Sequence, residues 1–278
     1  MTTSFSIRDC VGAALHVART QWRALLIASA IGAAATAAAA AVSMTSPGLA
    51  LVGGVLTWII QSFVYALFTR AALGGAPAIE PREGLRLFSA MLIVGFFLFL
   101  VFFVLMIPGV VVLLSGPMRP YIPEMQHAGQ NQAAMMEIVQ RFAQANPAPL
   151  LAFFGFYAIL WLLLTSRLYV AAPATVDAKR ILTFETWVWT KGQTLRILGA
   201  RIMLLAPAFI LMAALAYLVA RPFGVDLETG GAAQAASPGF VVYLALDRLI
   251  YFAVYAVLEA GLSAAIYRAL RPAARATA

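Results

Sequence analysis

Charged and strongly polar side chains inside long apolar stretches are the residues of this chain best placed to do chemistry. Glu259 lies in the apolar stretch 239–268, nine residues before Arg268. Nine helical residues rise about 13 Å, which would bring this carboxylate near the middle of a membrane-spanning helix. A charged carboxylate at that depth is costly unless it is paired, protonated or hydrated. Arg167 is the partner expected from depth, and Gln61, midway through another apolar stretch, is a second candidate.

These residues have two interpretations, and both stay open. Glu259, with Arg167 or Gln61, would form a site for an ion, a proton or a lipid headgroup. Alternatively, the charged residues form a structural pair that fixes the packing of helices. Asp247 and Arg248 lie nearer the opposite end of their stretch. Because adjacent side chains on a helix point about 100° apart, we expect these two to contact neighbouring helices or headgroups rather than each other.

Motifs for common enzyme chemistry are absent from the sequence. It contains no G-x-S-x-G turn, no H-E-x-x-H pair, no Gly-rich phosphate loop and no dinucleotide fingerprint. Cys10 is the only cysteine, and His16 and His127 lie in different segments, so we expect neither a disulfide nor a metal site. The sequence therefore predicts no catalytic residue, no metal and no cofactor.

The composition indicates a chain embedded in a membrane. Of its 278 residues, 63% are hydrophobic and 11% are charged, whereas about a quarter of a soluble domain is charged. Six apolar stretches are each long enough to cross a bilayer as a helix of about 20 residues. They are residues 24–44, 49–69, 88–114, 148–172, 198–220 and 239–268. We therefore predict an all-α, polytopic transmembrane helix bundle, with 1–278 as a single integral membrane domain.

The distribution of Lys and Arg predicts how this bundle is oriented. If the N-terminus is cytoplasmic, 15 of the 19 basic residues fall on the inner side, Arg119, Arg141 and Arg221 fall outside, and Arg248 lies within the last span. This asymmetry predicts six spans with both termini in the cytoplasm. We expect the guanidinium groups of Arg201 and Arg248 to extend toward the headgroups. The third span is long, so tilt or a break at Pro108 must absorb the excess length.

Short amphipathic helices are expected on the cytoplasmic side before spans one, three and five. The first covers 4–23, where apolar and basic residues alternate at helical spacing; the second covers 79–87 and the third 177–196. The sequences Arg19-Thr20-Gln21 and Lys191-Gly192-Gln193 precede spans one and five. They suggest repeated units of a surface helix and a two-helix hairpin, or unrelated hairpins that look alike because they enter the membrane from the same side. Such helices act as positive-inside signals, or they bind anionic lipid headgroups.

A composite motif begins at Leu162, where the chain runs LLLTSRLYVAAPATVDAKRILTFETWVWTKGQTLRILGARI. It has an Arg-x-Tyr at the end of a span, a proline four residues after the tyrosine, a short charged helix, and a basic–glycine pair. In these features the chain resembles the YciC-like proteins, which are related to the membrane domain of some glycerophosphoryl diester phosphodiesterases. The matching positions are Arg167, Tyr169, Pro173, Thr190, Lys191 and Gly192. The stretch 185–189 departs from the family, which usually has a serine there.

The resemblance implies a six-helix inner-membrane fold whose role is largely unassigned. Relatives with phosphodiesterase activity carry it on a separate soluble barrel. Eleven residues follow Tyr267, so we expect no such barrel here and do not carry hydrolase activity over.

The leading functional interpretation is a non-catalytic integral membrane protein in envelope or lipid homeostasis, or a membrane scaffold or partner subunit. The alternative is a small transporter or channel that uses Glu259, with Pro108, Pro173 and Pro207 permitting broken helices that line a cavity. A membrane enzyme acting on lipid is the third hypothesis, and no clustered acid, base and nucleophile supports it. The expected partners are the bilayer and anionic lipid headgroups, with a protein partner or second copy left open. The net charge of +8 does not indicate a nucleic-acid partner.

Overall fold

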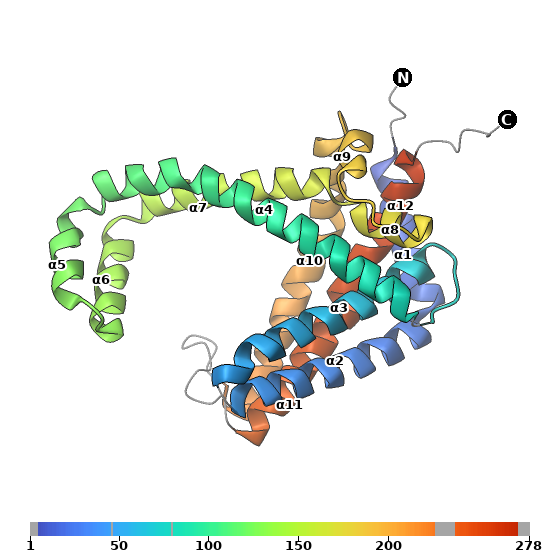
Figure 1. Ribbon diagram of the computed structural model, residues 1–278, viewed down its shortest axis with the longest axis horizontal. Coiled ribbons are helices and arrows are strands. Elements are labelled where there is room, and N and C mark those ends of the chain that lie inside the picture. Colours follow the sequence, from blue (N-terminus) through green and yellow to red (C-terminus); the bar gives the residue numbers. More distant parts are fainter. Residues whose placement is uncertain (1–4, 46, 79, 226–236, 272–278) are drawn as a thin grey trace. The chain divides into compact units, whose positions relative to one another are not determined.

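The computed structural model describes residues 5–45, 47–78, 80–225 and 237–271 (Figure 1). Its elements are α1 (Ile7–Thr20), α2 (Trp22–Thr45), η1 (Pro47–Leu49), α3 (Ala50–Ala72), α4 (Pro81–Ser115), η2 (Arg119–Tyr121), α5 (Ile122–Ala128), α6 (Gln132–Ala145), α7 (Pro147–Arg167), α8 (Ala171–Ala178), α9 (Glu185–Trp189), α10 (Thr194–Ala220), η3 (Arg221–Phe223), α11 (Pro238–Ile250), the π-helical η5 (Tyr251–Ala256) and α12 (Val257–Leu270).

Six of the helical segments in the described part of the chain are long and apolar enough to cross a membrane. They cover 22–44, 50–72, 81–115, 147–178, 194–223 and 238–270. The prediction of an all-α polytopic bundle is confirmed, and the chain is a multi-pass membrane protein. The sequence predicted one domain; the contacts group the chain into two compact units, 1–94 with 166–278, and 95–165. Each unit is described by itself below.

Helix α1 packs into the first unit instead of only covering its surface. Ser6 caps the helix by accepting a hydrogen bond from the amide of Asp9. The apolar face of α1 is buried against α12, which runs beside it in Figure 1. The helices come close together at Gly261, where an added Cβ would lie 3.1 Å from the Cα of Ala14 and 3.2 Å from its Cβ. The predicted helix in 4–23 is therefore confirmed within its described part, and its packing depends on glycine at 261.

Small residues bring α2 close to the neighbouring span α3. An added Cβ at Gly32 would lie 2.5 Å from a methyl group of Val64, and one at Gly53 would collide with the side chain of Ser43. Small side chains allow such close approach in membranes, where dispersion contacts replace the hydrophobic effect between helices. Helix α11 covers α2 from another side, as Figure 1 shows. This part of the bundle is therefore held by close backbone packing.

The boundaries differ from the predictions at three places. The fourth span does not run unbroken through 172, because α7 ends at Arg167 and a turn at 168–170 precedes α8. Residues 81–87 are the first turns of α4, so the second lead-in is continuous with its span; residue 79 lies outside the described part. In the last span, the π-helical turn η5 interrupts the α-helical hydrogen bonding between α11 and α12.

Two of the three prolines that could permit broken helices lie inside continuous helices, whereas Pro173 follows the break at 168–170. Helix α4 continues past Pro108, and α10 continues past Pro207. In the second unit, Pro108 removes a backbone donor from its turn, and the hydroxyl of Tyr157 donates to the carbonyl of Leu105 in that turn at 2.9 Å. Gly109 leaves room for this contact, because an added Cβ there would collide with the Tyr157 ring. A tyrosine on α7 thus supports the proline-containing turn of α4.

Candidate functional site

Arg167 and Thr190 are two positions of the composite motif, 23 residues apart, and the side chain of each donates a hydrogen bond to a backbone carbonyl of the other's segment. Nη2 of Arg167 donates to the carbonyl of Trp187 at 2.8 Å, and the guanidinium lies over the Trp187 ring, 4.8 Å from its centroid. In return, Oγ1 of Thr190 donates to the carbonyl of Arg167 at 2.8 Å. Because the last carbonyls of a helix lack helical donors, each side chain satisfies a terminal carbonyl of the other segment. We call this pair of contacts the Arg167–Thr190 clamp.

The remaining motif positions between 173 and 192 shape the backbone around the clamp. Pro173 is fully buried in the first turn of α8, where a proline is tolerated because no helical donor is needed there. Gly192 has a φ of +78°, a left-handed conformation that favours glycine. Lys191 beside it is exposed. The segment thus turns sharply from α9 into α10 and leaves the lysine at the surface.

Tyr169 links this segment to the last span and to Glu259. Its hydroxyl donates to the backbone carbonyl of Glu259 at 3.4 Å. The guanidinium of Arg201 lies over the Tyr169 ring, 4.9 Å from its centroid, and Nη1 of Arg201 donates to Oγ of Ser166 at 3.0 Å. Arg201 therefore bonds within the first unit, to the last turn of α7 and to the ring of Tyr169.

Four tyrosines, named here the tyrosine cluster, lie along the last span around the position of Glu259: Tyr65, Tyr169, Tyr251 and Tyr255. Tyr169 contacts the backbone of Glu259, Tyr251 and Tyr255 precede it by eight and four residues, and Tyr65 contacts Ser263, four residues after it. The hydroxyl of Tyr65 lies 3.5 Å from the hydroxyl of Ser263, and the rings of Tyr251 and Tyr255 stack with centroids 5.9 Å apart. The Glu259 side chain is only partly buried, and within the described ranges no hydrogen bond or ion pair reaches its carboxylate.

The structure does not bring Arg167 to Glu259, contrary to the expectation from depth. Arg167 ends α7 and its guanidinium turns to the carbonyl of α9, whereas the cation that acts on Glu259 is Arg201. Arg201 lies seven residues into α10 and Tyr65 lies seven residues before the end of α3. Both are therefore about 10 Å from a helix end. Gln61, one turn before Tyr65, has no hydrogen-bond partner among the described residues.

Asp247 and Arg248 contact each other, so the prediction that they would not is wrong. Nε of Arg248 lies 3.7 Å from Oδ2 of Asp247, and both side chains are partly exposed. The arginine side chain is long enough to reach Asp247 although adjacent positions of a helix point about 100° apart. At 3.7 Å between partly exposed groups, this pair contributes little to stability.

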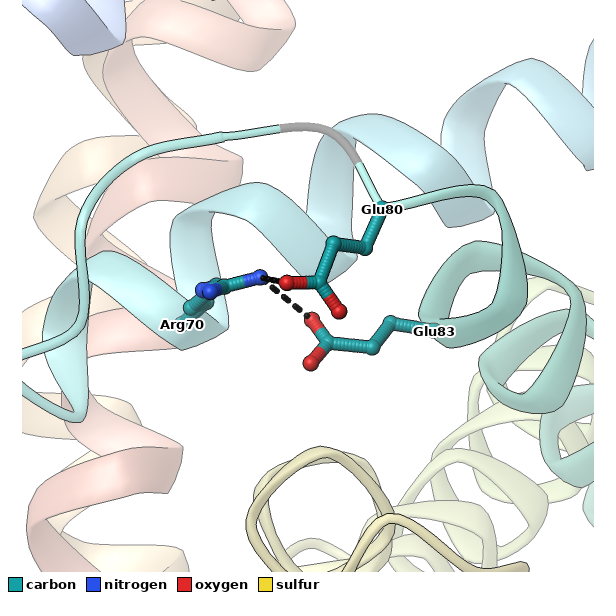
Figure 2. A network of polar contacts seen from close by, with 3 residues as sticks. All are labelled: Arg70, Glu80 and Glu83. Atoms are coloured by element: carbon teal, nitrogen blue, oxygen red, sulfur yellow. Dashed lines mark hydrogen bonds and ion pairs between the residues drawn. The ribbon is translucent and has the colours of Figure 1, made fainter.

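A second polar network closes the connection between α3 and α4 (Figure 2). Nη1 of Arg70 lies 2.5 Å from Oε1 of Glu80 and 3.4 Å from Oε2 of Glu83, and the two carboxylates point toward the guanidinium from the same side. The charge and hydrogen bonds of Arg70 hold the pKa of the exposed Glu80 below its ordinary value. Glu83 is buried. One arginine thus ties the loop and the start of α4 to the end of α3.

Cys10 is a packing residue in this structure. Its side chain is buried in the core with Val11 and Ala14. Burial, with a smaller effect of the neighbouring Asp9 charge, raises the pKa of the thiol to about 11. The thiol therefore remains protonated at neutral pH.

Each unit has an apolar groove among its described residues. The first, of about 620 Å³, lies between α2 and α3 and includes Ile31, Ile60 and Phe63 in its lining. The second, of about 650 Å³, lies between α4 and α7 beside Pro108 and Phe153. Glu259 and the tyrosine cluster line neither groove. Both grooves suit hydrocarbon chains better than polar solutes.

Sequence reasoning missed Arg201 and the three tyrosines that flank Glu259 from α3 and the last span. One signal was present in the sequence: Tyr251, Tyr255, Glu259 and Ser263 recur at every fourth position. This spacing places polar groups on one side of a helix. Tyr65 and Arg201 belong to other spans, and no pattern in the sequence around Glu259 indicates that they lie near it.

Comparisons of the chain with models of protein families, with curated proteins and with solved structures find no match.

Proposed function

We propose that the chain is a YciC-like, six-span protein of the bacterial inner membrane, with both termini in the cytoplasm. In this proposal it acts without catalysing a reaction, in envelope or lipid homeostasis, as a membrane scaffold or as a partner subunit. The observation that carries the proposal is the Arg167–Thr190 clamp. Both residues belong to the motif on which the family resemblance depends, and their polar atoms bind backbone carbonyls of the neighbouring segment.

The proposed orientation is supported by contacts that gather helix ends rich in basic residues. Nε2 of Gln21 donates to the carbonyl of Ala71, which joins the start of α2 to the end of α3. Tyr267 and Arg271 both donate to Oδ2 of Asp177, which joins the end of α12 to α8. Basic residues near these ends fit a cytoplasmic face, where anionic lipid headgroups attract them.

Deletion of the gene in its host and complementation with the chain test this role. The proposal predicts that the deletion strain becomes sensitive to detergents or changes its lipid composition, and that the wild-type chain restores both. Arg167→Lys, which weakens the clamp, should restore them less well than Arg196→Lys, a matched exchange at an exposed position. A deletion strain with an intact envelope and unchanged lipids would contradict the proposal.

The second candidate is a small transporter or channel that uses Glu259. The observation in its favour is the partly exposed carboxylate within a span, without an ion pair in the part of the chain that the structure describes. Buried ionisable groups in membranes frequently mark ion or substrate paths. This candidate predicts that Glu259→Gln abolishes flux of a solute or proton in vesicles, while the melting temperature of the purified variant stays unchanged.

A further inference from the structure

We infer that Glu259 and the tyrosine cluster form a binding site for an organic ammonium group, carried by a lipid headgroup or by a small soluble amine. The inference depends on the membrane placement in the proposed function and adds a ligand class to it. Four observations carry it: an unpaired carboxylate, a set of aromatic rings, one ring already covered by a cation, and a π-helical turn that aligns the groups.

The carboxylate requires a positive partner that the described residues do not fully supply. Glu259 lies eleven residues before the end of α12, about 17 Å along the helix, where a lone charge is costly. Arg201 acts on it electrostatically. However, Nη1 of Arg201 donates to Ser166 and its guanidinium covers Tyr169. Glu259 itself is partly exposed, and in our proposal a second cation reaches it there.

The rings supply the remaining part of an ammonium site. Ammonium groups bind to aromatic faces, most strongly where water is excluded. Arg201 over Tyr169 shows that one ring of the cluster already binds a cation in this way. Tyr251 and Tyr255 stack on each other, are partly exposed, and precede Glu259 by eight and four residues on the same span.

The π-helical turn places these two rings in line with Glu259. In a regular α-helix, positions four residues apart are rotated by about 40° and positions eight apart by about 80°, so Tyr251 would turn away from Glu259 although each successive pair stays close. A π-helical turn holds more residues per turn and reduces this rotation. Residues 251–256 form that turn directly before α12. Single π-helical turns recur at functional sites, and in our proposal this turn brings the two rings toward the side of Glu259.

Other ligand classes fit this cluster less well. Calcium and magnesium require about six oxygen ligands, commonly with more than one carboxylate, and the described residues contain no group of three His, Cys, Asp or Glu side chains that could hold a metal. An anion would be repelled by Glu259. A single carboxylate with several ring faces matches a singly charged organic cation.

Binding measurements on the purified, full-length chain test this inference. In detergent, we expect choline chloride or ethanolamine to bind with saturation, by calorimetry or by saturation-transfer NMR. In nanodiscs, native mass spectrometry would compare retention of phosphatidylethanolamine with that of phosphatidylglycerol. Saturable binding of the soluble amines identifies a small-molecule source, whereas retention of phosphatidylethanolamine alone identifies a lipid source. If neither the soluble amines nor phosphatidylethanolamine bind, the inference is overturned. The proposed role in homeostasis would be unaffected, because complementation tests it separately.

Variants distinguish the ring and carboxylate contributions from a general effect on folding. Glu259→Gln should weaken ammonium binding about tenfold, and Tyr255→Leu should have a similar effect. Tyr255→Phe keeps the ring face and should bind within about twofold of wild type. Asp247→Asn, a carboxylate change on the same span, is the matched control and should bind normally. Equal binding by wild type and Glu259→Gln, or full binding by Tyr255→Leu, would overturn the inference.

Discussion

Exchange of Arg167 for lysine is the perturbation whose effect the structure defines best. Lysine keeps the positive charge but loses the planar group that lies 4.8 Å above Trp187, and it cannot reproduce the 2.8 Å hydrogen bond to the Trp187 carbonyl with the same geometry. A hydrogen bond from a charged donor contributes about 1.5–3 kcal/mol, and a partly exposed cation–ring contact about 0.5–1 kcal/mol. Since lysine recovers part of both, we expect a loss of about 2 kcal/mol.

Limited proteolysis measures this loss locally. A loss of about 2 kcal/mol raises the population of detached α9 about thirtyfold. Trypsin cleavage at Lys179, Arg180 and Lys191 should accelerate by the same factor, because cleavage follows the open population when opening is fast. Arg196→Lys is the matched control and should leave the cleavage rate unchanged.

A second variant tests whether the clamp is one unit. Thr190→Val removes the donor to the Arg167 carbonyl and should destabilise the segment by about 1 kcal/mol. In the double variant with Arg167→Lys, the combined loss should be smaller than the sum, because the two side chains share one junction. Unchanged cleavage in Arg167→Lys, or strict additivity in the double variant, would refute the clamp as the element that holds α9.

Three further predictions concern other parts of the chain. Gly109→Ala should lower the melting temperature, with a loss of about 1–3 kcal/mol, because the added methyl collides with the ring of Tyr157; an unchanged melting temperature would contradict the packing of the proline turn. Because Arg70 lowers the pKa of Glu80, this contact should stabilise the fold fully above the ordinary glutamate pKa of about 4.3 and lose its effect as the pH falls through the lowered value. The free energy of unfolding of Arg70→Gln should therefore fall less steeply at acid pH than that of wild type. A variant whose free energy of unfolding falls as steeply as that of wild type would argue against the network. Since burial raises the thiol pKa of Cys10 to about 11, its maleimide labelling at pH 7 should be about 100-fold slower than that of a free thiol and should recover in denaturant; fast labelling of the folded chain would contradict its burial.

Much of the fold could be predicted from charge and hydropathy. The charge-free stretch between Arg23 and Arg70 predicts a hairpin of two spans, and the structure has α2 and α3 there. Long apolar runs specify such helices because every backbone group must be satisfied inside the segment. The break at 168–170 and the π-helical turn at 251–256 carry no local signal of this kind, since neither contains glycine or proline. Contacts with other spans determine both.

The candidate site was predicted only in part. Glu259 and Arg167 were identified because charges are rare in apolar spans. Their pairing was inferred from depth, which does not specify the direction in which a long side chain extends. Depth alone could equally have selected Arg201, which lies about 10 Å inside α10. The partner depends on which helices are neighbours, and that information is absent from a single sequence.

The most direct test of the account is the side of the membrane on which the chain ends. Fusions after Ala278 to green fluorescent protein and to alkaline phosphatase report opposite compartments. Six spans with cytoplasmic termini predict a fluorescent first fusion and an inactive phosphatase, together with an active phosphatase inserted between α5 and α6. An active phosphatase after Ala278 would contradict the account.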